Sequence, residues 1–360
     1  MPWNSKGHYR RGGMTKRAAQ AGVTLVELMV TMSVLVFIMA MLLALTNQTS
    51  RLWKGTTAKI EAFQNARAAY HSMTQRLSQA TLNTHLDYYD ATNNIRDPYS
   101  ATPFTPSYYA RNSELHFTTG PVATLVPNNG LTHTGHSVFF VAPLGLTTTT
   151  ADFGGLPRAL NACGYYVEFN TDATAIPPFL VGQSVIQPRW RFRLMEFLQP
   201  TEQLQIYKLP ISGSTTDYQR WFTDFLPPNS MAAPVRVVAE NIVALIIAPQ
   251  LPPDSTEAAI APDFSYDTRE GLPKDPNHHQ LPPLLRVVLI AIDEPSAVRL
   301  SQNAGTTPPT AITSALSGRF ATANQLDADI ATVSQALVDA RITFRVFDTT
   351  IALRGAKWSQ

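Results

Sequence analysis

The sequence predicts an α+β fold in which a long N-terminal helix, membrane-spanning in its first half, packs on an antiparallel β-sheet head. Three observations predict it. Residues Val23–Leu45 form an apolar run with one ionisable side chain, Glu27. Apolar residues then recur at helical spacing up to about residue 82. Short apolar runs bounded by Gly and Pro, typical of strands, follow in the rest of the chain.

The apolar run Val23–Leu45 is long enough to cross a membrane. At about 1.5 Å per residue it would extend about 35 Å as a helix, which exceeds the ~30 Å hydrocarbon core of a bilayer. Residues 1–22 carry only basic charges, which favours a cytoplasmic N-terminus and an exported head. Charge alone sets this orientation weakly, because basic residues also follow the run. They are Arg51, Lys54 and Lys59.

The helix is expected to continue beyond the membrane through residues 46–82. An apolar stripe recurs there at spacings of three, four and seven, which is the pattern of one helical face. Gly55 is a place where the helix could bend on leaving the membrane, and Asn and Thr near residue 82 indicate its end. The stripe consists of Trp53, Ile60, Phe63, Tyr70, Met73, Leu77 and Ala80.

Residues 83–360 are predicted to form a single β-rich head. Residues 84–112 are expected to be an irregular connection, and the loops are placed at 146–158, 249–283 and 301–318. Two short helices are predicted at Tyr218–Phe225 and Gln325–Ala340. The predicted strands are Glu114–Thr118, Ser137–Ala142, Tyr165–Asn170, Trp190–Leu198, Leu204–Leu209, Val235–Ile247, Leu284–Asp293 and Ile342–Leu353.

Composition limits the classes of function. Charged residues make up 15% of the 360 residues and the net charge is +2, so nothing global indicates nucleic-acid binding. The 27 prolines favour a loop-rich exported head. The single cysteine, Cys163, excludes an internal disulfide and is expected to be a buried apolar side chain, with a reactive or intermolecular thiol as the alternative.

The residues around Gly22 carry the most specific motif. Gly22 precedes the apolar run, and Thr24, Leu25 and Glu27 follow at once, whereas a secretory signal places its small residues after the run. This string resembles the type IV prepilin motif. The resemblance implies cleavage after Gly22 by a prepilin peptidase, methylation of the new terminal amine at Val23, and a leader of residues 1–22. A start at Met14 would shorten that leader.

Glu27 is unfavourable within an apolar span, since placing a charge at bilayer depth costs about 2.5–3.5 kcal/mol. Cleavage would free the amine of Val23, with which Glu27 of a neighbouring subunit can pair. The family is thought to use its glutamate in this way during subunit assembly. The alternative is that Glu27 reaches back to the cytoplasmic interface, because it lies only four residues into the span.

Several stretches of the head resemble two pilin-like groups, so the resemblance implies a pilin-like architecture over most of the chain. Val238–Leu245 and Leu281–Leu289, followed by Asp293, resemble strands of J-type minor pseudopilins. The remaining stretches resemble the Verru_Chthon cassette protein C family. They are Asn161–Val167, Trp190–Leu194 and Phe344–Trp358.

The sequence gives little evidence for a metal site or a catalytic site. The pairs His133/His136 and His278/His279 supply too few ligands for zinc, and adjacent histidines point apart in an extended chain. The acidic loop 254–275 lacks the spacing of an EF-hand calcium site. We therefore expect no metal, no cofactor and no catalytic residues, although a triad of distant residues stays open.

Arg189, Arg191 and Arg193 alternate with Trp190 and Phe192, which places the arginines on one face of a strand. Such a stripe can bind an acidic partner or nucleic acid. A half-buried strand with a solvated face explains it as well and is the favoured interpretation.

The sequence thus predicts a non-enzymatic, prepilin-type protein of the inner membrane with one span and a periplasmic head. Its expected partners are the prepilin peptidase and other pilin or pseudopilin subunits, in a type II secretion-like or type IV pilus-like fibre. One alternative is a single-pass anchored periplasmic binding protein or enzyme. Another is a DNA-binding minor pilin that uses the three arginines.

Overall fold

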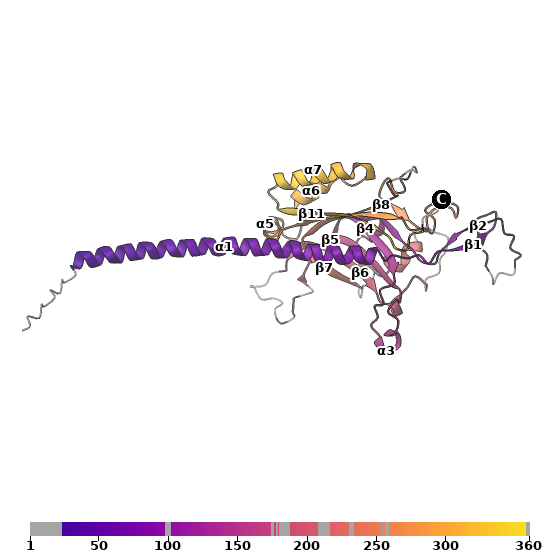
Figure 1. Cartoon of the computed structure of the whole chain (residues 1–360), viewed down its shortest axis with the longest axis horizontal. Coiled ribbons are helices and arrows are strands. Elements are labelled where there is room, and N and C mark those ends of the chain that lie inside the picture. Colours follow the sequence, from indigo (N-terminus) through magenta and orange to yellow (C-terminus); the bar gives the residue numbers. More distant parts are fainter. Residues whose placement is uncertain are drawn as a thin grey trace, which may run out of the picture. The chain divides into compact units, whose positions relative to one another are not determined.

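A computed structural model describes residues 24–97, 102–173, 176–177, 179, 188–207, 217–229, 234–253, 255 and 259–357. The chain divides into two compact units, Met1–Gly55 and Thr56–Gln360, which we call the N-terminal unit and the head unit. The helix α1, Leu25–Leu77, contributes its first part to the N-terminal unit and its last part to the head unit (Figure 1). Gly22 and Val23 lie outside the described residues.

The head unit contains three antiparallel sheets. A two-stranded hairpin joins β1, His85–Tyr89, to β2, Tyr108–Asn112. A three-stranded sheet has the order β11-β10-β8, in which β8 is Ile242–Gln250, β10 is Leu284–Ile292 and β11 is Phe344–Ala352. A six-stranded sheet has the order β7-β6-β5-β4-β3-β9. Its strands are β3 Thr118–Pro121, β4 Thr132–Ala142, β5 Asn161–Thr171, β6 Trp190–Gln199, β7 Val235–Glu240 and β9 Tyr266–Asp267.

Apart from α1, the helices of the head unit form a longer group of three and a shorter group. Figure 1 shows α6 and α7 lying over the sheet that contains β11, and Asp327 of α7 pairs with Arg286 of β10 at 2.6 Å. The longer helices are α5 Glu294–Ala304, α6 Thr310–Leu316 and α7 Leu326–Asp339. The shorter ones are α2 Val122–Leu125, α3 Thr150–Phe153, α4 Arg220–Thr223, η3 Thr201–Gln203, η4 Asp217–Gln219 and η5 Ala323–Gln325.

The core of the head unit lies between the two larger sheets. Strand β10 is almost wholly apolar because α7 covers one of its faces and the six-stranded sheet lies beyond the other. The sheets approach closely where the hydroxyl of Thr134 on β4 donates to the carbonyl oxygen of Val243 on β8 at 2.7 Å. Gly135 is required at this approach, because its φ is +71° and a Cβ would lie 2.3 Å from the carbonyl oxygen of Leu245.

The last turns of α1 contact both the three-stranded and the six-stranded sheet. Met73 and Leu77 are fully buried, as the apolar stripe predicts. The hydroxyl of Tyr70 donates to the carbonyl oxygen of Val287 on β10 at 2.7 Å. On the other sheet, Arg76 forms an ion pair with the buried Glu196 of β6. The helix therefore shares one core with the sheets.

The predicted α+β class is confirmed, and several boundaries differ. α1 ends at Leu77 instead of near residue 82, because the amide of Thr81 donates to the carbonyl oxygen of Val141 and draws the chain onto β4. The prediction of one strand over Val235–Ile247 is wrong. Asn241 takes a φ of +63°, which divides the run into β7 and β8 in different sheets.

Other local predictions were also wrong. The expected irregular connection at 84–112 contains the hairpin β1–β2, and the expected loop at 301–318 contains α6. The predicted strand Glu114–Thr118 begins only at Thr118, because Phe117 bonds instead to Thr268 in an irregular crossing. The described part of Leu204–Leu209 is a turn, and its last two residues lie outside the described ones.

Candidate functional site

The N-terminal unit presents an apolar helix with a single acidic side chain. The segment Leu25–Ser50 has 26 residues, so it extends about 39 Å, enough to cross a bilayer. None of it is buried inside the protein. So large an apolar surface is unfavourable in water, and a lipid bilayer or other apolar helices would remove it from water.

Glu27 lies in the first turn of this helix and is exposed. Its amide donates to the hydroxyl of Thr24 at 3.3 Å, so Thr24 caps the helix immediately before the acid. A carboxylate in this turn is favoured by the helix dipole. Its side chain makes no ion pair with a described residue, which leaves the carboxylate available to a cation outside these residues.

The three alternating arginines are neutralised by acids of the head unit. Arg189 is 53% exposed and bonds Asp172 at 2.9 Å. Arg193 is buried, with Glu240 at 3.2 Å. Arg191 is buried too and pairs with the carboxylate of Glu294 at 3.4 Å. The interpretation of the three arginines as a solvated strand face is therefore wrong for Arg191 and Arg193.

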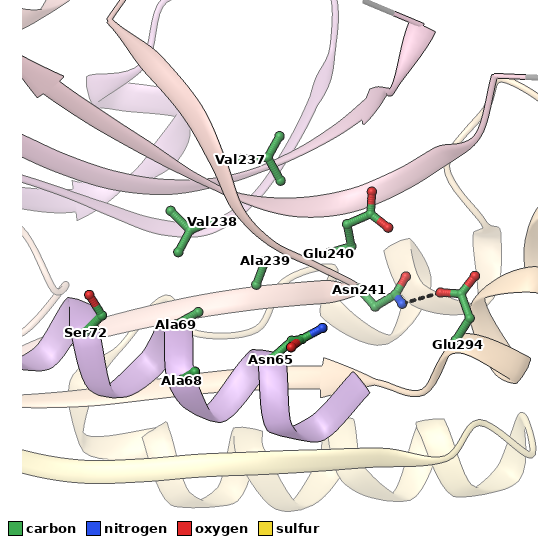
Figure 2. Close-up of a pocket in the computed structure, with 10 residues that line it drawn as sticks. All are labelled: Asn65, Ala68, Ala69, Ser72, Val237, Val238, Ala239, Glu240, Asn241 and Glu294. Atoms are coloured by element: carbon green, nitrogen blue, oxygen red, sulfur yellow. Dashed lines mark hydrogen bonds between the residues drawn. The ribbon is translucent and has the colours of Figure 1, made fainter. Parts of the chain in front are cut away.

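Two of those acidic partners, Glu240 and Glu294, lie at a groove beside α1, which we call the α1–β7 groove. One wall is the outer edge of β7 from Val237 onward, and the other is the face of α1 that carries Ala68, Ala69 and Ser72 (Figure 2). The groove has a volume of about 620 Å³. Among the described strands, β7 is at the end of its sheet and pairs with β6 alone. The groove therefore combines a strand edge that no described strand pairs with and a helix face of small side chains.

Asn241 closes one end of the groove. Its amide nitrogen donates to Glu294 at 2.7 Å, as Figure 2 shows. Its side-chain oxygen is buried without a hydrogen-bond partner. Neither Asn241 nor Glu294 was predicted from sequence to be a site residue. An asparagine that interrupts an apolar run was the available signal, because asparagine is among the few residues that tolerate positive φ.

The histidine pairs do not form metal sites. His133 bonds Glu168 at 3.2 Å, whereas His136 is buried and bonds only backbone groups. His278 and His279 do not point apart as expected, because His279 has a φ of +50° and the two ring centroids lie 4.1 Å apart. Among the described residues, no three His, Cys, Asp or Glu side chains are placed to hold a metal ion.

The remaining candidates are structural groups. Asp267 of the acidic loop pairs with the buried His116 at 2.6 Å, and Asp275 accepts the amide of Leu272 at 2.6 Å. Asp254 and Glu257 of that loop lie outside the described residues. Cys163 is fully buried, and burial raises the pKa of its thiol, which suits an unreactive core side chain.

The comparisons with known proteins bear on the N-terminal segment. Residues 17–43 match the family model of the prokaryotic N-terminal methylation motif. No curated protein and no solved structure matches the chain. Together with the apolar helix and the antiparallel sheets behind it, the match supports placing the chain among prepilin-type proteins of the type IV pilin-like superfamily.

Proposed function

We propose that this chain is a minor pilin or pseudopilin, a non-catalytic subunit of a type II secretion-like or type IV pilus-like fibre. A prepilin peptidase would cut after Gly22 and methylate the amine of Val23. The observation that carries the proposal is the methylation motif at residues 17–43, with Glu27 on the first turn of an apolar helix of membrane-spanning length. Before assembly the chain would cross the inner membrane once, with the head in the periplasm.

Glu27 would select and position the subunit within the fibre. A carboxylate at bilayer depth costs about 2.5–3.5 kcal/mol, and the terminal amine of a neighbouring subunit would offset that cost by forming an ion pair. Since Glu27 makes no ion pair with a described residue, this pairing requires no internal contact to break. The apolar face of the helix would then exchange lipid for the helices of other subunits.

The finer family assignment rests on the head. The stretches that resemble J-type minor pseudopilins lie on β7, β8 and β10, and those that resemble the Verru_Chthon cassette protein C family lie on β5, β6 and β11. These strands belong to both larger sheets. The likeness favours a minor subunit with an enlarged head, in a fibre of either the secretion-like or the pilus-like kind.

Two alternatives are weaker. A DNA-binding pilin would need accessible basic side chains, and Arg191 and Arg193 are buried beside Glu294 and Glu240. An anchored periplasmic binding protein or enzyme would keep its leader, and the motif around Gly22 would then have no role.

The proposal is tested by assembly of a Glu27→Leu variant in a host that carries the prepilin peptidase and its fibre system. Its leader should still be cut, but the subunit should remain in the membrane fraction and be lost from sheared fibres. Thr31→Leu is the matched control, because Thr31 is exposed one turn further along the same helix. Assembly of Glu27→Leu at the wild-type level, or absence of the wild type from fibres, would overturn the proposal.

A further inference from the structure

The hairpin β1–β2 covers a second cavity of the head unit, with a volume of about 620 Å³, which we call the hairpin cavity. Figure 1 shows the hairpin at the end of the head beyond the C-terminal end of α1. Four segments distant in sequence meet there. They contribute Tyr89, Asn112, Tyr218, Arg269 and the histidines at 278 and 279, among other residues. A cavity of this size falls in the range of small-ligand sites.

Arg269 brings a buried cation to the cavity wall. It is 94% buried, and no carboxylate of a described residue lies within ion-pair distance of it. One terminal nitrogen donates to the carbonyl oxygen of Glu114, and its guanidinium lies 5.6 Å from the ring centroid of Tyr218. Its Nε has no hydrogen-bond partner. The wall therefore holds an N–H donor without an acceptor.

The adjacent histidines His278 and His279 add two buried ring nitrogens without hydrogen-bond partners. Burial lowers the pKa of His278 and that of His279, the latter to about 3, so both imidazoles are neutral at pH 7. Nδ1 of His278 has no hydrogen-bond partner. In the neutral tautomer that carries its proton on Nε2, this nitrogen is an acceptor without a donor.

Such a set of unsatisfied atoms is uncommon. A buried polar atom without a partner costs about 1–3 kcal/mol, and native proteins hold few of them. Three such atoms here belong to Arg269, His278 and His279, all of which line one cavity. Each of these atoms is shielded from solvent in this structure, so contact with a ligand in the cavity requires the side chains to turn toward it.

The rest of the wall favours the same chemistry. The side chain of Asn112 makes no hydrogen bond with a described residue, and its amide both donates and accepts. Tyr89 and Tyr218 contribute aromatic rings. Glu114, also on the wall, opposes the charge of Arg269 and disfavours a purely anionic ligand. A metal ion is disfavoured by the lack of a third ligand among the described residues.

We propose that the hairpin cavity binds a saccharide. Successive hydroxyl groups of one sugar can donate to Nδ1 of His278 and accept from Nε of Arg269, which an ion that only accepts cannot do. The amide of Asn112 and the rings of the two tyrosines match the remaining polar edges and apolar faces of a sugar. The inference rests on the head unit alone and holds whether or not the leader is cut.

The test is calorimetric titration of the full-length chain in phospholipid nanodiscs, which avoids detergents with sugar headgroups. The probes are maltotriose, cellotriose, tri-N-acetylchitotriose and trigalacturonate. We expect at least one to bind with a Kd of about 1 mM or tighter. Binding of a neutral trisaccharide assigns hydroxyls to Arg269, and binding of trigalacturonate alone assigns it a sugar carboxylate. Both outcomes support the inference.

Three variants locate the binding. Tyr218→Leu should weaken it about tenfold or more, and Asn112→Trp should abolish it by filling the cavity. Asn128→Trp is the matched control for Asn112→Trp, since Asn128 is exposed and does not line the cavity. Absence of binding for all four probes, or unchanged binding in a folded Asn112→Trp variant, would overturn the inference. A Gly22→Ala variant that binds normally separates this result from the proposed processing.

Discussion

His136 should make the stability of the head fall in mildly acidic solution. The side chain is buried on β4, where Nε2 donates to the carbonyl oxygen of Phe320 at 3.0 Å and Nδ1 accepts the amide of Ile247 at 3.2 Å. This pair of bonds fixes the neutral imidazole, because a proton on Nδ1 would face a donor. Burial lowers the pKa of His136 from 6.5 to about 4.

The direction of the effect follows from which state binds the proton. The unfolded chain gains a proton on this histidine below about pH 6.5, whereas the folded chain gains it only near pH 4. The stabilisation is therefore fully present above the unfolded pKa and is lost as the pH falls toward the folded one. Between pH 7 and pH 5 the loss from this one group should be about 2 kcal/mol.

The assay is urea unfolding of the full chain in mild detergent at both pH values, followed by the fluorescence of the buried Trp221. The comparison is with His136→Gln, which carries no titrating group. The wild type should lose about 2 kcal/mol more than the variant between pH 7 and pH 5, because other titrating groups are common to both. Equal pH dependence in the two proteins would refute the reasoning.

Four further variants test the packing of the head by the same unfolding measurement. Glu196→Gln should cost about 3 kcal/mol, because it removes the buried charge that pairs with Arg76 and Arg236. Arg236→Ala, whose side chain is 59% exposed, should cost below about 1 kcal/mol. Equal costs would contradict the ion-pair account. Met73→Ala should cost about 2–5 kcal/mol by opening a cavity under α1, and a loss below about 1 kcal/mol would show that this helix face is not in the core. Gly135→Ala should cost at least about 2 kcal/mol, since its new Cβ would meet the backbone of Leu245, and a wild-type midpoint would contradict that contact.

The N-terminal helix and several strands were predictable because their signals are local. A run of 26 residues with one charge allows few structures besides an apolar helix. The apolar spacing also identified Met73 and Leu77 as core residues. Strands such as Tyr165–Asn170 were located from a local signal too, since Tyr, Val and Phe favour strands.

The predictions that failed depend on contacts between distant segments. The stripe of Arg191 and Arg193 suggests a solvated face until Glu240 and Glu294 are brought beside it. The hairpin β1–β2 is rich in Tyr and polar residues, and its stability comes from cross-strand pairs such as Tyr88 with Tyr109, 4.3 Å apart. No local period reveals such pairs.

One missed element did carry a local signal. α5 begins after Asp293, whose carboxylate accepts the amide of Ser296 at 3.0 Å, with Pro295 in the first turn. The predicted strand Leu284–Asp293 included Asp293, so the prediction placed this helix cap inside a strand. The two cavities were beyond sequence reasoning, since each is lined by segments that only the fold brings together.

The central claim is that the chain is a prepilin, processed at Gly22 and then assembled. The most direct test is the intact mass and the N-terminal peptide of the protein from membranes of a host with a prepilin peptidase, beside a Gly22→Ala variant. The account predicts that the wild type begins at methylated Val23 and that the variant keeps residues 1–22. A leader retained on both proteins would contradict it and would make this chain an anchored protein whose function lies in its head alone.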